Sequence, residues 1–337
     1  MPLPWRRQLL SLLPRLGLGS RPLGPGVTLV SRKDSEPHVT QVSGEAWVVE
    51  LDKRPRARLS VEELDESTWL LQRRRGPRRS VRRMGPPELR THLVVDEEAA
   101  RTAIANQQMK LAHYISAEHI AWVLRELDVN CVLDVGGNRG QFGRRLRQSG
   151  YAGRIVSFEP LPHLAEQLHV HADKDPEWHV VHCALGDEET ESDMTVVAKG
   201  GATSSLLPPS AFGLEFSPRL EGIRRETVTI RRLDGLLDEV VDGIDDPRIF
   251  LKMDTQGYDL RVFAGAGDRI KDVLGLQSEI SSVPLYDGMP RMAEAIATYE
   301  AGGFETTGIF PVTRDPERLR IIEFDIVMIR VEALGDR

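Results

Sequence analysis

The stretch that decides the fold is LDVGGNRGQFG, residues Leu133–Gly143. It overlaps a short, nearly all-apolar run, CVLDV (Cys131–Val135), and leads into a helix-like segment, Gln141–Gln148. An apolar run before a glycine cluster is typical of a buried parallel strand. Glycines in a strand-to-helix turn let backbone N–H groups approach a ligand closely, and the helix N-terminus favours an anionic group. The stretch therefore predicts a ligand-binding strand–turn–helix unit.

Further short apolar runs follow along the chain, most of them separated by segments of helix length. They are Arg154–Phe158, His179–Cys183, Ile249–Met253, Val273–Glu279 and Glu323–Arg330. This rhythm predicts the α/β class, with a mostly parallel, Rossmann-like sheet and helices on both faces. Two stretches of alternating character, Asp193–Val197 and Glu226–Arg231, interrupt the rhythm and predict an inserted, hairpin-like β arm.

The first hundred residues differ in charge from the rest. Residues 1–100 carry 18 basic and 13 acidic side chains, whereas the whole chain has a net charge of −7. Such asymmetry indicates separate structural units, so we expect a basic, partly disordered appendage over 1–100 and a main domain over 105–332. Within the appendage, Val61–Gln72 has a helix-like pattern, and no internal repeat is evident. Leu70–Arg90 holds eight arginines and one acid, which predicts an extended basic linker or, alternatively, a patch for phosphates.

Composition also bears on the compartment. The chain has 337 residues and only two cysteines, which exclude a disulfide-stapled scaffold. No stretch approaches the roughly 20 apolar residues that a transmembrane helix needs. The apolar run Leu9–Leu13 is too short for a secretory signal and ends at Pro14. We therefore expect a cytoplasmic protein without a transmembrane segment.

Acidic residues at the ends of the first two strands point to the cofactor. Asp134 stands before Gly136, Asn138 and Gly140. A dinucleotide-binding turn would require a further glycine where Val135 stands. An acid there repels a pyrophosphate but suits the ammonium of an amino acid, as in S-adenosylmethionine. Glu159 ends the second strand, where an acid takes the two ribose hydroxyls.

The end of the third strand completes this predicted site, because Ala184 is small enough to lie against an adenine ring. We expect the side chains of Asp134 and Glu159 at strand ends rather than in the core, so that alanine at either position leaves the domain folded.

Several motifs in order make the region from about Leu111 to Arg330 resemble the FkbM-type S-adenosylmethionine-dependent methyltransferases. Besides the glycine turn they are SFEP (157–160), ALGD (184–187), RLD (232–234), LKMDTQGYDL (251–260), QSE (277–279), PLYDG (284–288), GGF (302–304) and EFD (323–325). The resemblance implies a class I methyltransferase fold and O-methylation of a hydroxyl on a sugar, polyketide or related metabolite. The acceptor is then a small molecule or glycan, and no sequence-specific nucleic-acid partner is expected.

The end of the fourth strand is where we look for the acceptor, since ligands of open α/β sheets bind beyond the carboxyl ends of the strands. Asp254 and Gln256 suit the positioning of a hydroxyl, and Asp254 suits the removal of its proton, but Asp254 equally suits a helix cap. Glu279 ends the fifth strand at the same edge. Two acids there would also suit Mg²⁺, yet no metal-ligand spacing occurs, so we expect no metal. The alternatives are a non-catalytic binding protein or a nucleotide-dependent oxidoreductase.

Overall fold

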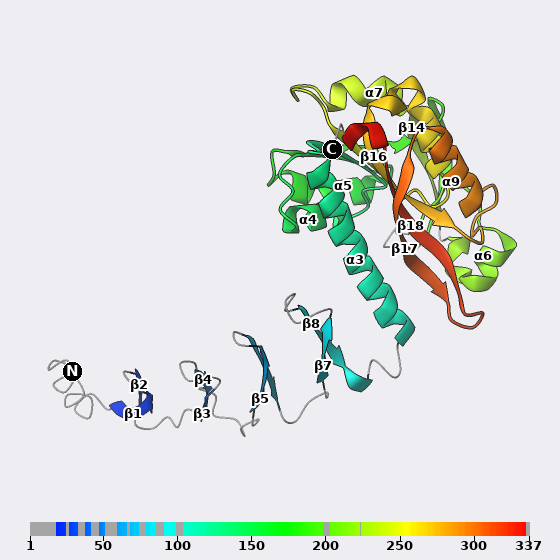
Figure 1. Ribbon diagram of the computed structural model, residues 1–337. Helices are drawn as coiled ribbons and strands as arrows, with labels where there is room; N and C mark the ends of the chain where they lie inside the picture. Colours follow the sequence, from blue (N-terminus) through cyan, green and yellow to red (C-terminus); the bar gives the residue numbers. More distant parts are fainter. Residues whose placement is uncertain are drawn as a thin grey trace. The chain divides into compact units, whose positions relative to one another are not determined.

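In the computed structural model, the chain forms two compact units, Met1–Ile104 and Ala105–Arg337 (Figure 1). It describes residues 18–24, 27–32, 38–41, 47–50, 59–65, 68–73, 79–84, 91–98, 104–197, 203–222 and 224–334. The stretch Leu9–Leu13, which the secretory-signal argument used, lies outside these residues.

A seven-stranded sheet forms the centre of the second unit. In spatial order its strands are β11 (Trp178–Val181), β10 (Arg154–Phe158), β9 (Cys131–Val135), β15 (Ile249–Met253), β16 (Val273–Ser281), β18 (Arg320–Ile329) and β17 (Glu305–Asp315). The strands from β11 to β16 pair in parallel, and β18 is antiparallel to both of its neighbours. Because β9 and β15 are fully buried, each is an apolar run with a single charged residue, Asp134 in β9 and Lys252 in β15.

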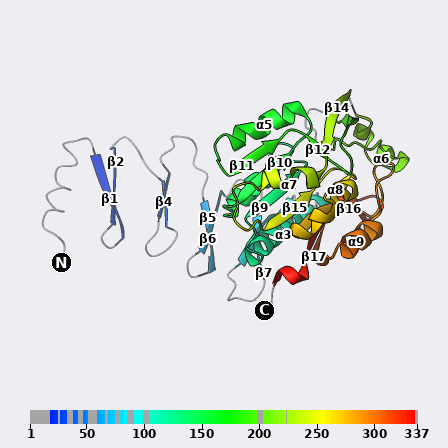
Figure 2. The ribbon, with the colours of Figure 1, turned by 90° about the horizontal axis from the view of Figure 1, so that it is seen from above.

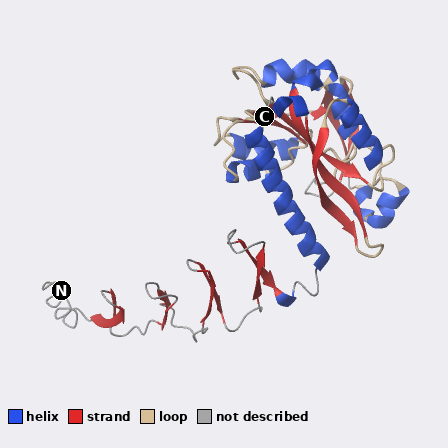
Figure 3. Cartoon of the chain, in the orientation of Figure 1, coloured by secondary structure: helices blue, strands red, loops and turns tan. Residues whose placement is uncertain are grey.

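Helices cover both faces of this sheet (Figures 2 and 3). Apolar side chains of α3 (Ile104–Glu126), α4 (Gln141–Gln148) and α5 (Pro162–Ala172) pack with Val132, Ile155 and Phe250 on one face. On the other face, α7 (Leu233–Val240), α8 (Asp259–Gly265) and α9 (Met292–Ala301) pack with Leu133, Leu251 and Met253. The predicted α/β class with a mostly parallel, Rossmann-like sheet is confirmed.

The inserted arm is a separate small sheet. Its strands are β12 (Ala184–Leu185), β13 (Thr190–Val196) and β14 (Arg224–Arg231), and β13 pairs antiparallel with β14 as the alternating patterns predicted. Between β13 and β14 lie α6 (Ala211–Phe216) and the 3-10 turn η3 (Pro218–Glu221); the remaining 3-10 turns are η4 (Gly267–Asp272) and η5 (Val331–Leu334).

The described residues of the first unit form β-hairpins, which corrects three expectations. The hairpins are β1 (Leu18–Gly24) with β2 (Val27–Arg32), β3 (His38–Gln41) with β4 (Trp47–Glu50), β5 (Leu59–Asp65) with β6 (Thr68–Arg73), and β7 (Arg79–Met84) with β8 (Thr91–Asp96). The helix expected over Val61–Gln72 is wrong, because both halves of that stretch are strands. The basic segment Leu70–Arg90 is not simply a linker, since parts of it lie in β6 and β7.

An internal repeat is also present, contrary to the sequence analysis. The first strands of the hairpins begin at residues 18, 38, 59 and 79, a nearly constant interval. The repeated feature is a hairpin of variable turn length rather than a constant residue motif, so the repeat is hard to detect in the sequence.

A buried ion pair joins the two central strands of the sheet. Asp134 of β9 lies directly opposite Lys252 of β15, and Lys252 Nζ is 2.9 Å from Asp134 Oδ1. The Asp134 side chain is 0% exposed and that of Lys252 5%. Ser157 Oγ donates to Asp134 Oδ2 at 2.9 Å, and Trp178 Nε1 donates to Ser157 Oγ at 3.0 Å. The expectation that Asp134 lies outside the core is therefore wrong.

No helix in the described ranges is both long enough and apolar enough to cross a membrane.

Removing the buried ammonium should destabilise the protein strongly. Lys252→Met leaves the Asp134 carboxylate buried without a counter-charge, so the free energy of unfolding should fall by about 3–5 kcal/mol. Adding Asp134→Asn in the same chain should recover most of that loss. Urea denaturation followed by circular dichroism measures both, with the exposed Lys271→Met as the control, expected within about 0.5 kcal/mol of the parent. An equal loss in the single and double variants would contradict the ion-pair account.

The second unit should fold without the first. A chain of residues 100–337 keeps every strand of the central sheet and of the arm, so its urea midpoint should match that of the full chain. A chain beginning at Thr91 is the comparison, because it retains β8 without its partner β7. A loss of cooperative unfolding in the shorter chain would show that the hairpins complete the fold.

Candidate active site

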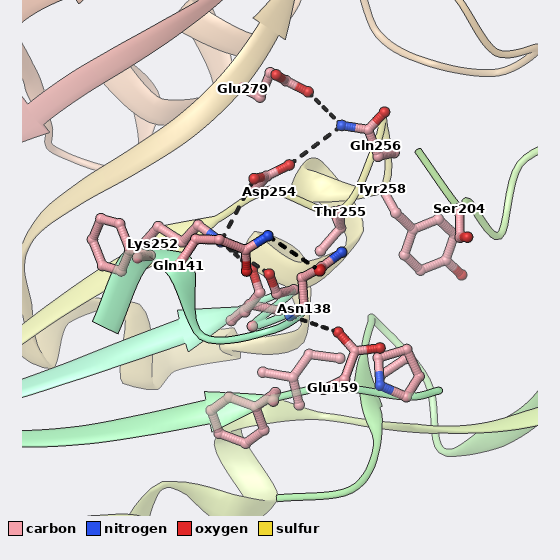
Figure 4. Close-up of a pocket in the computed structure, with 18 of the residues that line it drawn as sticks. Asn138, Gln141, Glu159, Ser204, Lys252, Asp254, Thr255, Gln256, Tyr258 and Glu279 are labelled. Carbon is pink, nitrogen blue, oxygen red and sulfur yellow. Dashed lines mark hydrogen bonds and ion pairs between the residues drawn. The ribbon is translucent and has the colours of Figure 1, made fainter. Parts of the chain in front are cut away.

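A cavity of about 240 Å³ opens at the carboxyl ends of the central strands (Figure 4). Here the chain passes from β9 to β10 on one side of the sheet and returns to β15 on the other. Ligands of open α/β sheets bind at such a reversal of strand order. The cavity lining includes the turn after β9, α4, the ends of β10 and β12, the loop after β15, and residues of β16 and β18.

The glycine turn after β9 lies directly against the loop after β15. Gly136 has φ +77°, a conformation that favours glycine, and a Cβ there would stand 2.2 Å from the backbone oxygen of Asp254. Gly140 also has a positive φ of 74° at the N-terminus of α4. The turn therefore needs glycine both for its backbone conformation and for its close approach to the neighbouring loop.

Glu159 lies directly against this turn and lines the cavity. Its Oε2 accepts a hydrogen bond from the Asn138 backbone N–H at 2.8 Å, and its Oε1 accepts one from the Leu161 N–H at 3.0 Å. Burial raises the pKa of Glu159 to about 7, while these two backbone N–H groups act in the opposite direction. The carboxylate keeps further lone pairs toward the cavity, where Ala184 forms part of the wall. A ribose diol beside an adenine ring fits this arrangement.

Two carboxylates at the other end of the cavity are joined by one amide. Gln256 Nε2 donates to Glu279 Oε2 at 2.8 Å and to Asp254 Oδ1 at 3.3 Å (Figure 4). The Tyr286 hydroxyl donates to Gln256 Oε1 at 3.1 Å, which leaves the NH₂ group for the two carboxylates. All three predicted catalytic residues, Asp254, Gln256 and Glu279, are thus brought together.

The backbone of Gln256 is in a left-handed conformation, with φ 54°. A non-glycine residue in this conformation is held there by its surroundings, and such residues cluster at functional sites. Ser205 of the inserted arm supplies one restraint, because its Oγ donates to the Gln256 backbone oxygen at 2.8 Å. The arm therefore helps to place the amide between the two acids.

The helix-cap interpretation of Asp254 is wrong. Asp259, four residues after Thr255, accepts from the Thr255 N–H at 2.9 Å, and its other oxygen accepts from Ser278 Oγ at 2.7 Å and from the Glu279 N–H at 3.1 Å. Asp259 is thus the acid that orders this loop. The Asp254 side chain is 45% exposed and lines the cavity.

Other acids lie close to Glu279. Asp325 of β18 is directly opposite Glu279 of β16, and Glu323 lies two residues away on the same strand face. Burial, then the charge of Glu323, raises the pKa of Glu279 well above the usual carboxylate value. Burial likewise raises the pKa of Glu323 to about 7 and that of Asp325 to about 6. No group of three or more His, Cys, Asp or Glu residues within the described part of the chain is arranged to hold a metal ion.

Most of the residues predicted from the sequence line the cavity. They are Gly136, Asn138, Glu159, Ala184, Asp254, Gln256 and Glu279, whereas Asp134 and Gly140 do not line it. Sequence reasoning missed several other lining residues, among them Arg145, Lys252, Gln277 and Asp325. A usable signal was present for the last three, because each is a polar residue within a strand of the central sheet.

Comparisons with known proteins agree with this geometry. The family model of the methyltransferase FkbM domain matches residues 134–306, just over half of the chain. No curated protein sequence matches the chain.

Solved structures resemble it distantly. Aeropyrum pernix fibrillarin with bound S-adenosyl-L-methionine shares 14% identity and a TM-score of 0.35, over 59% of this chain and 66% of that one. Magnesium protoporphyrin IX methyltransferase from Synechocystis PCC 6803 shares 9% identity and a TM-score of 0.37, over 68% and 85%. At such identities and scores these two structures do not bear on the activity of this chain.

The family match begins at Asp134 and contains the glycine turn, Glu159, Ala184 and the Asp254–Gln256–Glu279 group. The cavity also has the features that the cofactor of this family, S-adenosylmethionine, needs: a glycine turn, an acid for a ribose and a small apolar wall. The chain belongs to the FkbM methyltransferase family, and its cofactor is S-adenosylmethionine.

Proposed function

We propose that the chain transfers the methyl group of S-adenosylmethionine to a hydroxyl oxygen of a small-molecule or glycan acceptor. The observation that carries the proposal is the Gln256 amide, which holds the Asp254 and Glu279 carboxylates at one end of the cavity. Hydrogen-bond acceptors gathered around one point suit a ligand that brings hydroxyl donors.

The adenosine end of the cofactor belongs at the opposite end of the cavity. Glu159 would take the ribose hydroxyls, and the turn at Gly136 and Asn138 would lie against the sugar. Ala184 would leave room for the adenine. The donor would then lie in the cavity that the glycine turn and the Asp254 loop both line.

Proton removal falls to Glu279. When bound, S-adenosylmethionine supplies a methyl carbon already activated by positive sulfur, so the chain needs only to orient the acceptor and take its proton. Glu279 would accept the proton that the acceptor hydroxyl gives up during the transfer. The raised pKa makes Glu279 a stronger base than an ordinary carboxylate. Asp254, more exposed and 3.7 Å from Lys252 Nζ, orients the hydroxyl.

Substitution of either acid should separate catalysis from cofactor binding. Glu279→Gln and Asp254→Asn should each lower turnover by about 10²–10⁴, the range for a lost general base or positioning group. Their affinity for S-adenosylhomocysteine should stay within about twofold. Methyl transfer from labelled cofactor to a panel of sugars and polyols measures turnover. The exposed Asp268→Asn is the control and should behave like the parent. Full activity in Glu279→Gln would remove that residue from the mechanism.

The pH profile should identify the base. Glu279 must be unprotonated to accept a proton, so kcat should rise with pH through a range well above an ordinary carboxylate pKa of about 4.3. Removing the like charge of Glu323 by Glu323→Gln should lower the pKa of Glu279 and move the rise toward acid pH. An unmoved profile in Glu323→Gln would argue that a different group takes the proton.

A further inference from the structure

The place that the sequence analysis assigned to the cofactor's ammonium is already taken by a cation of the protein. Lys252 Nζ lies 2.9 Å from Asp134 Oδ1 and donates to the backbone oxygens of Val135 and Gly136 at 3.2 and 3.1 Å. Asp134 itself does not line the cavity. The amino-acid tail of the cofactor, with one ammonium and one carboxylate, therefore needs a different pair of charges.

Arg145 provides a cation that the carboxylate of this tail could contact. It projects from the last turn of α4, lines the cavity and lies in the field of Asp325, Asp134 and Asp254. Among the described residues it forms no ion pair of 4.0 Å or less, and its Nη1 lies 3.4 Å from His113 Nδ1. An arginine only donates, so His113 accepts here through Nδ1. Burial lowers the pKa of His113, which keeps this ring neutral near pH 7.

Gln277 and Asp325 provide acceptors opposite this cation. Gln277 is 7% exposed and lines the cavity, and its Oε1 is buried without a hydrogen-bond partner in the structure. Its side chain also hydrogen-bonds Asp325, which fixes the amide with Nε2 toward that carboxylate. A buried amide oxygen without a donor is costly, so it indicates a ligand donor at this point.

Register places these groups on one side of the sheet. Gln277 is opposite Lys252, and Asp325 is opposite Glu279, two residues farther along β16. Residues two apart on a strand share a face, so all four side chains share the face that Lys252 presents to Phe142 of α4. Arg145 belongs to the same helix. Arg145 and Asp325 interact electrostatically but do not form a direct ion pair. This leaves room for a zwitterion between them.

We propose that Arg145 binds the α-carboxylate of the S-adenosylmethionine tail, and that Asp325 and Gln277 Oε1 bind its α-ammonium. This inference rests on the proposed function, because it concerns the same cavity. It assigns the tail to α4, β16 and β18 instead of to Asp134.

Two nucleosides test the assignment by isothermal titration calorimetry. S-adenosylhomocysteine carries the amino-acid tail, and 5′-methylthioadenosine lacks it. Arg145→Gln, Asp325→Asn and Gln277→Leu should each weaken S-adenosylhomocysteine binding, by about 10- to 100-fold for the two charged residues and less for Gln277. Their affinity for 5′-methylthioadenosine should not change. Arg145→Lys should retain part of the binding, since it keeps the charge and loses the paired donors.

Control variants separate this proposal from the proposed function. Arg144→Gln removes the same charge from the same helix, outside the cavity lining, and should bind both nucleosides as the parent does. Glu159→Gln should weaken both equally, because both carry the ribose. Parent-like S-adenosylhomocysteine affinity in Arg145→Gln and Asp325→Asn would overturn the tail assignment. A parent protein that binds neither nucleoside would overturn the proposed function instead.

Discussion

The active-site end of the sheet depends on one buried ion pair, Lys252 with Asp134. A lysine ammonium at 5% exposure is stable only where its charge and its three donors are all satisfied. The Asp134 carboxylate and the backbone oxygens of Val135 and Gly136 do this together. The Phe142 ring, with its centroid 5.5 Å from Lys252 Nζ, adds a cation–π interaction. The pair thus ties β15 to the glycine turn that follows β9.

This ion pair explains how two loops from distant parts of the chain come into contact. Gly136 approaches the Asp254 backbone so closely that no side chain fits between them. The Asp254 loop is then shaped by Asp259, which accepts hydrogen bonds from Thr255 and Ser278, and by Ser205 of the arm. The Gln256 amide is consequently held between two acids. A buried polar network of this kind specifies one arrangement, because each unmade hydrogen bond would cost free energy.

The acids beyond Gln256 give this end of the cavity its chemical character. Glu279, Glu323 and Asp325 lie on adjacent strands with raised pKa values, since burial and mutual repulsion both disfavour the charged forms. Carboxyl groups with raised pKa values bind protons at higher pH than ordinary carboxylates do, and a nearby cation favours release of the proton. A positively charged cofactor therefore favours the ionised form of the base that the proposed reaction needs.

The sequence by itself determined six of the seven strands of the central sheet, the glycine turn, the β arm, the family and the cofactor, whereas β17 was not predicted. These features are local: apolar runs, alternation and glycine spacing act over a few residues, and β9, β10 and β15 have the predicted bounds. The hairpins of the first unit escaped detection because an alternating strand and a helical stripe are hard to distinguish over a dozen residues.

Only the tertiary structure decided what the charged residues do. From the sequence alone, Asp134 is interpreted as a ligand-binding acid. Strand register places Lys252, over a hundred residues later, opposite it, and this makes Asp134 the partner of a buried lysine. From the sequence alone, Asp254 suits a helix cap as well as a catalytic role. In the structure it is Asp259 that accepts the hydrogen bond from the Thr255 N–H of this loop. The pairing of Gln256 with Glu279, and of Glu279 with Asp325, likewise depends on which strands are neighbours. Electrostatic roles depend on distance and burial, and both are properties of the folded chain rather than of sequence position.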